Sequence, residues 1–318
     1  MTLIDPKTPL GGVIPPIITP LTPAGDIDTR SLTRLVNFEV DAGVSAIFVH
    51  GTGGEGPYLS DAEQHTVLAT VTEAVAGRVP VLAGVSDIGT NKVLKNVGIA
   101  EQYPVDALVT TSAFYGSVGP VEIAHHYRTI AARSDLPLYA YDIPVFAGTK
   151  LPAELIVELA HEGVIRGVKD TSGEEDGFRY MIENTRDLPG FSVITGSDIT
   201  GDAAILQGAH GLIVGVANID PHGFVKVFEA ASRGDWAAAR IEQERLHKLR
   251  LIAKIAAKRI SGFSATIGAF KAAMVLRGII DHDLLQAPLQ QINEQEKEQV
   301  AAVLASQGLG RIPELSRV

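Results

Sequence analysis

Short apolar runs alternate with longer amphipathic stretches along the first 232 residues of the chain. Each run is continuously apolar and lacks the alternation of a half-exposed strand, which is the pattern of a parallel sheet covered on both faces. We therefore predict eight buried parallel strands, at residues 12–19, 45–50, 79–85, 107–111, 137–141, 164–169, 191–195 and 211–215.

The amphipathic stretches between these runs predict helices. Two of them carry clear start signals. The letters S-D-A-E at 60–63 form a capping box, and Asp220 stands before a first-turn proline at Pro221. The predicted helices lie near residues 29–42, 60–76, 90–102, 120–133, 152–161, 174–186, 199–208 and 221–232.

Eight strand–helix units in about 230 residues match a (β/α)8 TIM barrel, whose active site lies at the C-terminal ends of the strands. A doubly wound open sheet is the structural alternative. Beyond Gly234 the pattern is helical only, at 235–259, roughly 265–277, and 287–306. We predict a catalytic barrel over residues 1–232 and a C-terminal helical appendage over 233–318 that packs on it.

Composition narrows the possible functions. The chain has 318 residues, a formal net charge of −10 and no cysteine. The missing cysteines exclude disulfides, thiolate nucleophiles and cysteine metal sites, and the negative charge argues against nucleic acid and anionic membranes as partners. No apolar run approaches the roughly 20 residues of a membrane span. Since residues 1–9 also lack a signal-peptide pattern, we expect a cytoplasmic protein.

Three other chemistries fail on their motifs. The nine histidines show no metal-ligand spacing, and neither H-E-x-x-H nor a G-x-S-x-G elbow occurs, so we expect no metal site and no serine hydrolase triad. The letters G-T-G-G-E-G at 51–56 match G-x-G-x-x-G, but residues 57–59 separate them from the helix, which removes the dinucleotide geometry. Such a loop can instead offer backbone N–H groups to a small carboxylate, or it is a plain tight turn.

The strand at 164–169 ends on Lys169, and D-T-S-G follows at once. A buried ammonium is costly unless it is paired or deprotonated, and a neutral lysine can form a Schiff base with a carbonyl substrate. The alternative is a surface lysine paired with Asp170. At other strand ends, Tyr141 could transfer protons or be a core aromatic, and Asp198 could bind substrate hydroxyls or cap the next helix.

Several separated motifs point to one family. The chain carries G-T-G-G-E at 51–55, Y-D-I-P at 141–144, G-V-K-D-T-S-G at 167–173 and G-S-D at 196–198, followed by an eighth-strand segment at 211–218. In these residues and their order it resembles the dihydrodipicolinate synthase / N-acetylneuraminate lyase family of class I, Schiff-base aldolases. The motifs span nearly the whole barrel.

The resemblance implies a role for each matched residue. Lys169 would form an imine with the ketone of pyruvate or another 2-keto acid, and Tyr141 would be the general acid/base beside it. Thr52 would relay protons between Tyr141 and Tyr115, the latter reaching in from a neighbouring subunit. A protonated imine is an electron sink that makes a carbanion at C3 accessible, so aldol addition and carbon–carbon cleavage both become possible.

The resemblance also implies the rest of the site. Backbone N–H groups near Thr52 and Gly53 would hold the substrate carboxylate, and further substrate contacts would come from Asp198, Ile213 and Gly215. No cofactor is implied beyond the covalent imine on Lys169. The family is usually a homotetramer, a dimer of dimers.

Three departures from the family pattern bear on the substrate. Phe146 stands where dihydrodipicolinate synthases use an arginine to grip the carboxylate of aspartate semialdehyde, and a phenyl ring cannot replace that guanidinium. Gly53 replaces the second threonine, as in members similar to 2-keto-3-deoxygluconate aldolases. Ile199 and Gly215 stand where sialic acid lyases have a glutamate and a serine.

These observations favour a pyruvate-linked class I aldolase for a 2-keto-3-deoxy sugar acid or a similar hydroxylated 2-keto acid. The alternatives are a dihydrodipicolinate synthase, an N-acetylneuraminate lyase and a dehydratase that uses the same imine. A non-catalytic keto-acid sensor is a further alternative, against which the presence of Lys169, Tyr141 and Thr52 argues.

Overall fold

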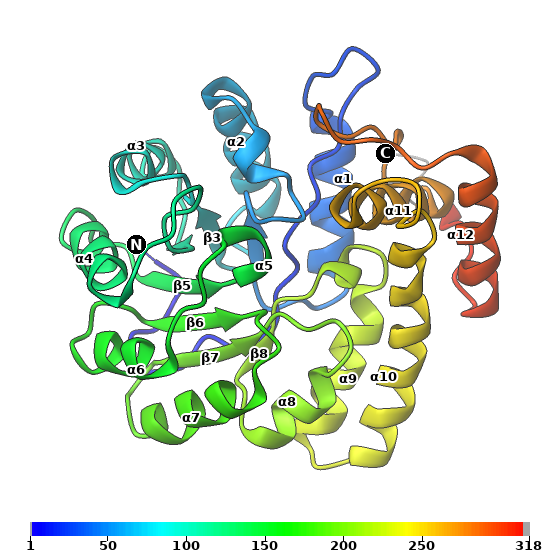
Figure 1. Cartoon of the computed structure of the whole chain (residues 1–318). Coiled ribbons are helices and arrows are strands. Elements are labelled where there is room, and N and C mark those ends of the chain that lie inside the picture. Colours follow the sequence, from blue (N-terminus) through cyan, green and yellow to red (C-terminus); the bar gives the residue numbers. More distant parts are fainter. Residues whose placement is uncertain (1, 314–318) are drawn as a thin grey trace.

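The computed structural model describes residues 2–313 and confirms the predicted (β/α)8 barrel with a C-terminal helical part (Figure 1). Eight parallel strands adjoin in the order β1-β8-β7-β6-β5-β4-β3-β2. Backbone hydrogen bonds from Ser45 to Val13 and from Phe48 to Pro15 connect the first two strand segments and close the ring. The strands are β1 Gly12–Val13, β2 Ile47–Val49, β3 Val81–Gly84, β4 Ala107–Thr110, β5 Leu138–Asp142, β6 Gly167–Asp170, β7 Ser192–Thr195 and β8 Gly211–Leu212.

Helices surround this barrel, as Figure 1 shows. The α-helices are α1 Thr29–Asp41, α2 Asp61–Val75, α3 Thr90–Ala100, α4 Pro120–Ala131, α5 Pro144–Ala147, α6 Ala153–His161, α7 Glu175–Thr185, α8 Gly201–Gln207, α9 Pro221–Ser232, α10 Trp236–Arg250, α11 Gly262–Arg277 and α12 Glu294–Ser306. The described residues also form the 3-10 turns η1 Gly56–Tyr58, η2 Gly215–Asn218 and η3 Leu251–Lys254. Helices α10, α11 and α12 lie together on one side of the barrel, at the right of Figure 1.

The strands are buried on both faces, which explains their continuously apolar sequences. One apolar cluster, with Ile14, Phe48 and Leu82 among its members, fills the inside of the barrel. A second cluster lies between the strands and the helices. Each fully buried Val, Leu, Ile or Phe side chain contributes about 1.5–3 kcal/mol, so these layers fix the positions of the strand ends that carry the site.

Both predicted helix starts are present. Ser60 accepts a hydrogen bond from the backbone N–H of Glu63, whose carboxylate accepts one from the N–H of Ser60. Asp220 accepts a hydrogen bond from the N–H of Gly223 at the start of α9. These contacts satisfy backbone donors that a helix leaves unpaired at its first turn.

The C-terminal predictions were partly wrong. The helix predicted over 235–259 ends at Arg250 in α10 and continues only as the short turn η3, where Ile252 and Ala253 turn into the core. The helix predicted from 287 begins at Glu294, because Asn293 and Glu296 form a capping box there. The division of the chain at residue 232 stays a prediction.

No helix within residues 2–313 combines the length and the apolar character that crossing a membrane requires.

Candidate active site

Lys169 lies at the C-terminal end of β6 with only 4% of its surface exposed. Its Nζ atom is 4.0 Å from the ring centroid of Tyr141 and 5.3 Å from that of Phe48. Within residues 2–313 it forms no ion pair, and the expected alternative partner, Asp170, accepts a hydrogen bond from the N–H of Ser172 instead. The alternative of a surface lysine paired with Asp170 is therefore wrong.

Tyr141 is the direct neighbour of Lys169 on the adjacent strand β5, since the two residues are paired in the register of β5 and β6. Its hydroxyl lies 3.2 Å from the hydroxyl of Thr52, and either group can donate this hydrogen bond. The side chain is 4% exposed. The structure thus brings buried Lys169 and Tyr141 together with partly buried Thr52 at the strand ends.

The loop that carries Thr52 and Gly53 packs against the backbone of the first strand segment. A Cβ atom on Gly53 would lie 3.1 Å from the carbonyl oxygen of Pro16, and one on Gly54 would lie 2.7 Å from that of Ile17. Among the described residues, no protein acceptor takes a hydrogen bond from the N–H of Thr52 or Gly53. These two donors are available to a small anion.

Glu55 holds the same loop in place through contacts with the C-terminal part of the chain. Its carboxylate is fully buried, lies 2.5 Å from the Nζ atom of Lys271 on α11, and accepts a hydrogen bond from the N–H of Gln286. Lys271 also donates to the carbonyl of Leu284, and burial lowers the pKa of its ammonium. The sequence motif contained Glu55 but did not reveal its partner, because Lys271 lies far along the chain.

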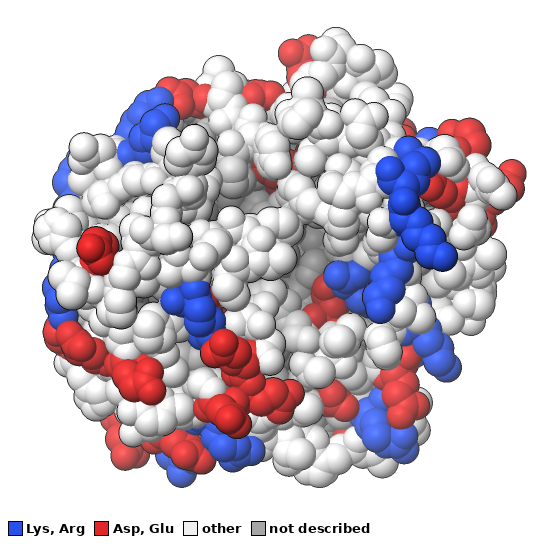
Figure 2. Space-filling view, viewed as in Figure 1, with Lys and Arg blue, Asp and Glu red and all other residues white. Residues whose placement is uncertain are grey.

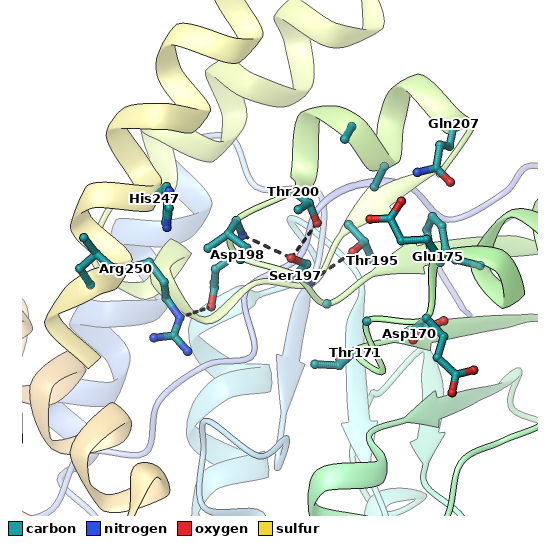
Figure 3. A pocket seen from close by; sticks show the side chains of 18 of the residues that line it. Asp170, Thr171, Glu175, Thr195, Ser197, Asp198, Thr200, Gln207, His247 and Arg250 are labelled. Atoms are coloured by element: carbon teal, nitrogen blue, oxygen red, sulfur yellow. Dashed lines mark hydrogen bonds and ion pairs between the residues drawn. The ribbon is translucent and has the colours of Figure 1, made fainter. Parts of the chain in front are cut away.

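A polar cavity of about 480 Å³ lies between the ends of β6 and β7 and helix α10 (Figure 3). Thr171, Ser197 and Thr200 are among the residues that line it. The Thr200 hydroxyl donates a hydrogen bond of 2.8 Å to that of Ser197, while the Thr171 hydroxyl is buried without a protein partner among the described residues. This cavity presents hydrogen-bonding groups suited to a hydroxylated ligand.

Gly196 forms the wall between this cavity and the lysine. A Cβ atom at this position would overlap the Thr171 hydroxyl and would lie 3.1 Å from the Cε atom of Lys169. The glycine of the G-S-D motif is therefore required for space rather than for an unusual backbone angle, because its φ is not among the positive values.

Asp198 lines the polar cavity, but both of its carboxylate oxygens are already engaged. One accepts a hydrogen bond from the N–H of Val216, and the other lies 2.9 Å from the Nε atom of Arg250 (Figure 3). It makes no side-chain cap to α8. Asp198 thus fixes the relative position of the β7 loop, η2 and α10.

The remaining predicted residues differ in their placement. Ile213 is buried among the side chains that fill the barrel, and Gly215 begins η2, where a Cβ would lie 2.9 Å from the ring of Phe270. Tyr115 is 98% exposed, with a φ of 83° on the loop between β4 and α4. Within this chain, Tyr115 is therefore apart from the cluster of Lys169, Tyr141 and Thr52.

His50 is a residue that the sequence reasoning missed. It stands directly before the G-T-G-G-E loop, has a φ of 55° and lines a second cavity beside Thr52 and Tyr141. Its Nε2 atom is buried without a partner among the described residues, and burial lowers the pKa of the ring to about 4. Left-handed backbone at a non-glycine residue is costly and concentrates at functional sites. The position of His50 at the end of the strand predicted over residues 45–50 is the signal from which the sequence could have identified it.

The face shown in Figure 2 is hollowed near its middle. Most atoms around the hollow belong to uncharged residues, with Lys and Arg gathered along its right side and Asp and Glu below it. In the described part of the chain, no group of three or more His, Asp or Glu side chains could hold a metal ion.

The chain is similar to known proteins over nearly its whole length. Residues 9–307 match the model of the dihydrodipicolinate synthetase family. The chain is 32% identical to an uncharacterized DapA-like lyase of Halobacterium salinarum, over 95% of this chain and 96% of that protein. It is 29% identical to a probable 2-dehydro-3-deoxy-D-pentonate aldolase of Escherichia coli, over 94% and 97% of the two chains.

A solved structure is similar to this chain in its fold. A prophage protein of the dihydrodipicolinic acid synthase family from Escherichia coli K12, in complex with pyruvate, superimposes with a TM-score of 0.88. The two share 26% sequence identity, over 94% of this chain and 99% of that one.

Proposed function

The chain belongs to the dihydrodipicolinate synthetase family and is a carbon–carbon lyase, and from this premise we propose that Lys169 forms its imine with pyruvate. The observation that carries this proposal is the cluster of buried Lys169 and Tyr141 with partly buried Thr52, in which the lysine lacks a carboxylate partner among the described residues. An unpaired buried amine that is set against a phenol is suited to attack on a ketone.

The proposed reaction uses these groups in sequence. The N–H groups of Thr52 and Gly53 hold the carboxylate, and the amine of Lys169 replaces the C2 ketone oxygen, which leaves as water. In the cleavage direction, Tyr141 accepts the proton of the C4 hydroxyl while the C3–C4 bond breaks and an aldehyde departs. The bonding electrons pass into the protonated imine, C3 then takes up a proton, and hydrolysis frees pyruvate and Lys169.

We propose a 2-keto-3-deoxy sugar acid, or a similar hydroxylated 2-keto acid, as the substrate. The cavity beside Gly196 supports this choice, because the hydroxyl-bearing residues Thr171, Ser197 and Thr200 line it. Phe146 in place of an arginine argues against aspartate semialdehyde, and the Escherichia coli relative is named for a 2-dehydro-3-deoxy acid. Product analysis separates this activity from a dehydratase, because only the aldolase releases pyruvate.

Tyr115 belongs to the proposal through a second subunit. Tyr115 is almost completely exposed on the loop between β4 and α4, so its phenol is free to contact a neighbouring copy of the site. We propose that the enzyme is a homotetramer in which Tyr115 joins the proton relay of the partner.

The test is borohydride reduction in the presence of pyruvate, followed by peptide mass spectrometry. The expected result is a pyruvate-derived adduct on the peptide that contains Lys169 and none on the peptide that contains Lys271, a buried lysine paired with Glu55. Lys169→Ala should abolish the adduct while leaving the melting temperature close to that of the parent. An unmodified Lys169 in folded protein would refute the proposal.

A further inference from the structure

A second cavity opens on the opposite side of Lys169 from the polar one. It has a volume of about 460 Å³ and includes Thr52, Tyr141 and Phe48, the groups nearest the lysine amine. The polar cavity instead reaches the lysine through Thr171 and Gly196. Lys169 therefore lies between two spaces of similar size, either of which could hold the part of a substrate beyond the keto acid.

The walls of the second cavity are mostly apolar, and aromatic rings form its outer part. The ring of Phe263, at the start of α11, stacks on that of Tyr58, with centroids 6.0 Å apart. Phe146 meets Phe263 edge to face, with centroids 5.1 Å apart. We name Tyr58, Phe146 and Phe263 the aromatic cluster. It gathers rings from η1, α5 and α11 at one opening.

The aromatic cluster is only partly covered. Phe146 is 49% exposed and Tyr58 is 41% exposed, although both line the cavity. Grouped, exposed aromatic side chains are uncommon unless they bind something, and a cavity of this volume is in the range that holds a small ligand. The phenyl ring of Phe146 also stands where a cationic side chain would be needed for an acidic acceptor.

We propose a further activity, in which pyruvate bound to Lys169 adds to aldehydes that carry an apolar or aromatic substituent. This inference rests on the proposed function, since it uses the same imine. The protonated imine loses a C3 proton to the relay of Tyr141 and Thr52 and becomes an enamine. Its carbon C3 then attacks the aldehyde carbon and forms the new C–C bond, and the aldehyde oxygen takes that proton back from Tyr141. Water then hydrolyses the imine, regenerating the amine and releasing a 4-hydroxy-2-oxo acid. The substituent of the aldehyde lies against the aromatic cluster.

The apolar walls predict a graded selectivity. Burial of one methylene group changes binding by about fourfold, so kcat/KM for straight-chain aldehydes should rise about fourfold per added carbon from propanal to pentanal. Benzaldehyde should be accepted, because an aromatic ring can pack against the ring faces and edges of the cluster. A hydroxylated acceptor such as glyceraldehyde uses the other cavity and should not follow this series.

The experiment measures the 4-hydroxy-2-oxo acid formed from pyruvate and each aldehyde with the full chain. Phe146→Ser should flatten the chain-length series and lower the rate with benzaldehyde about tenfold or more, whereas Phe146→Leu should preserve the series because an apolar wall remains. Phe146 is half-exposed, so both variants should fold, which a melting curve checks. Tyr180→Ala, on the exposed side of α7, removes an aromatic ring that does not line either cavity and is the matched control.

The outcomes separate this inference from the proposed function. If pyruvate labels Lys169 and glyceraldehyde reacts, but aldehydes with apolar chains do not react or show no dependence on length, the inference is overturned and the proposed function stands. The same holds if Phe146→Ser leaves the series unchanged. If pyruvate does not label Lys169 at all, both fail together.

Discussion

The buried ion pair of Glu55 and Lys271 offers a quantitative test of how the catalytic loop is held. Both side chains are fully buried, and the ammonium and carboxylate each have a backbone hydrogen-bond partner in addition to one another. Lys271→Met removes the ammonium and keeps the approximate shape, but it leaves the carboxylate of Glu55 without its counter-charge. Removing one partner of such a pair costs about 3–5 kcal/mol.

The double variant Glu55→Gln/Lys271→Met isolates the cause. An amide at position 55 can still accept the hydrogen bond from the N–H of Gln286, and no charge is left buried. We therefore expect the double variant to recover at least half of the stability that Lys271→Met loses. Urea denaturation curves of the parent, the two single variants and the double variant measure the coupling.

An exposed ion pair is the matched control. Arg240 and Glu244 are also 2.5 Å apart, but both side chains are more than half exposed. Arg240→Met should cost less than about 1 kcal/mol, because water screens the pair. Equal losses at the two sites, or additivity of Glu55→Gln and Lys271→Met within about 0.5 kcal/mol, would contradict the reasoning. The pyruvate concentration that gives half-saturation should also be higher for Lys271→Met than for the parent, since the pair supports the loop that carries Thr52.

Three further predictions concern single residues. Tyr141→Phe should still be labelled by pyruvate and borohydride while turnover falls about 100-fold or more; unchanged turnover would assign the proton transfer to another group. Gly196→Ala should slow labelling of Lys169 at least tenfold by crowding it, whereas Gly98→Ala, where a Cβ meets no atom within 4 Å, should not; equal labelling rates would disprove the steric argument. Burial raises the pKa of Glu39 well above 4.5, so the native state holds a proton that the unfolded state releases, and stability falls as pH rises above 4.5. Glu39→Gln should therefore melt higher than the parent at pH 7 and lose that advantage as pH falls towards 4.5; an advantage that grows on acidification would refute this assignment.

The barrel could be predicted because its strands are apolar on both faces and because helix starts such as Ser60 and Asp220 use local hydrogen bonds. The lysine was found because an ammonium at the end of an apolar run is costly and therefore conspicuous. The register of β5 and β6 then makes Tyr141 the neighbour of Lys169 once these two strands pair.

Contacts between segments that lie far apart in the chain could not be predicted from the sequence. Nothing near Asp198 indicates that Arg250 binds it, and nothing near Glu55 indicates Lys271. The end of α10 at Arg250 has no local glycine or proline signal, because it follows from the burial of Ile252 and Ala253 against the core. In each case the deciding interaction exists only after the chain has folded.

The missing side chain at Gly196 has a consequence for how the enzyme could change its specificity. Because Gly196 has no side chain, only its main-chain atoms lie between Lys169 and the hydroxyl-lined cavity, and a Cβ there would be 3.1 Å from the Cε atom of the lysine. In the two activities proposed above, one lysine serves two cavities with different linings. Substitutions in the wall of one chamber would alter its range of aldehydes without disturbing chemistry directed into the other.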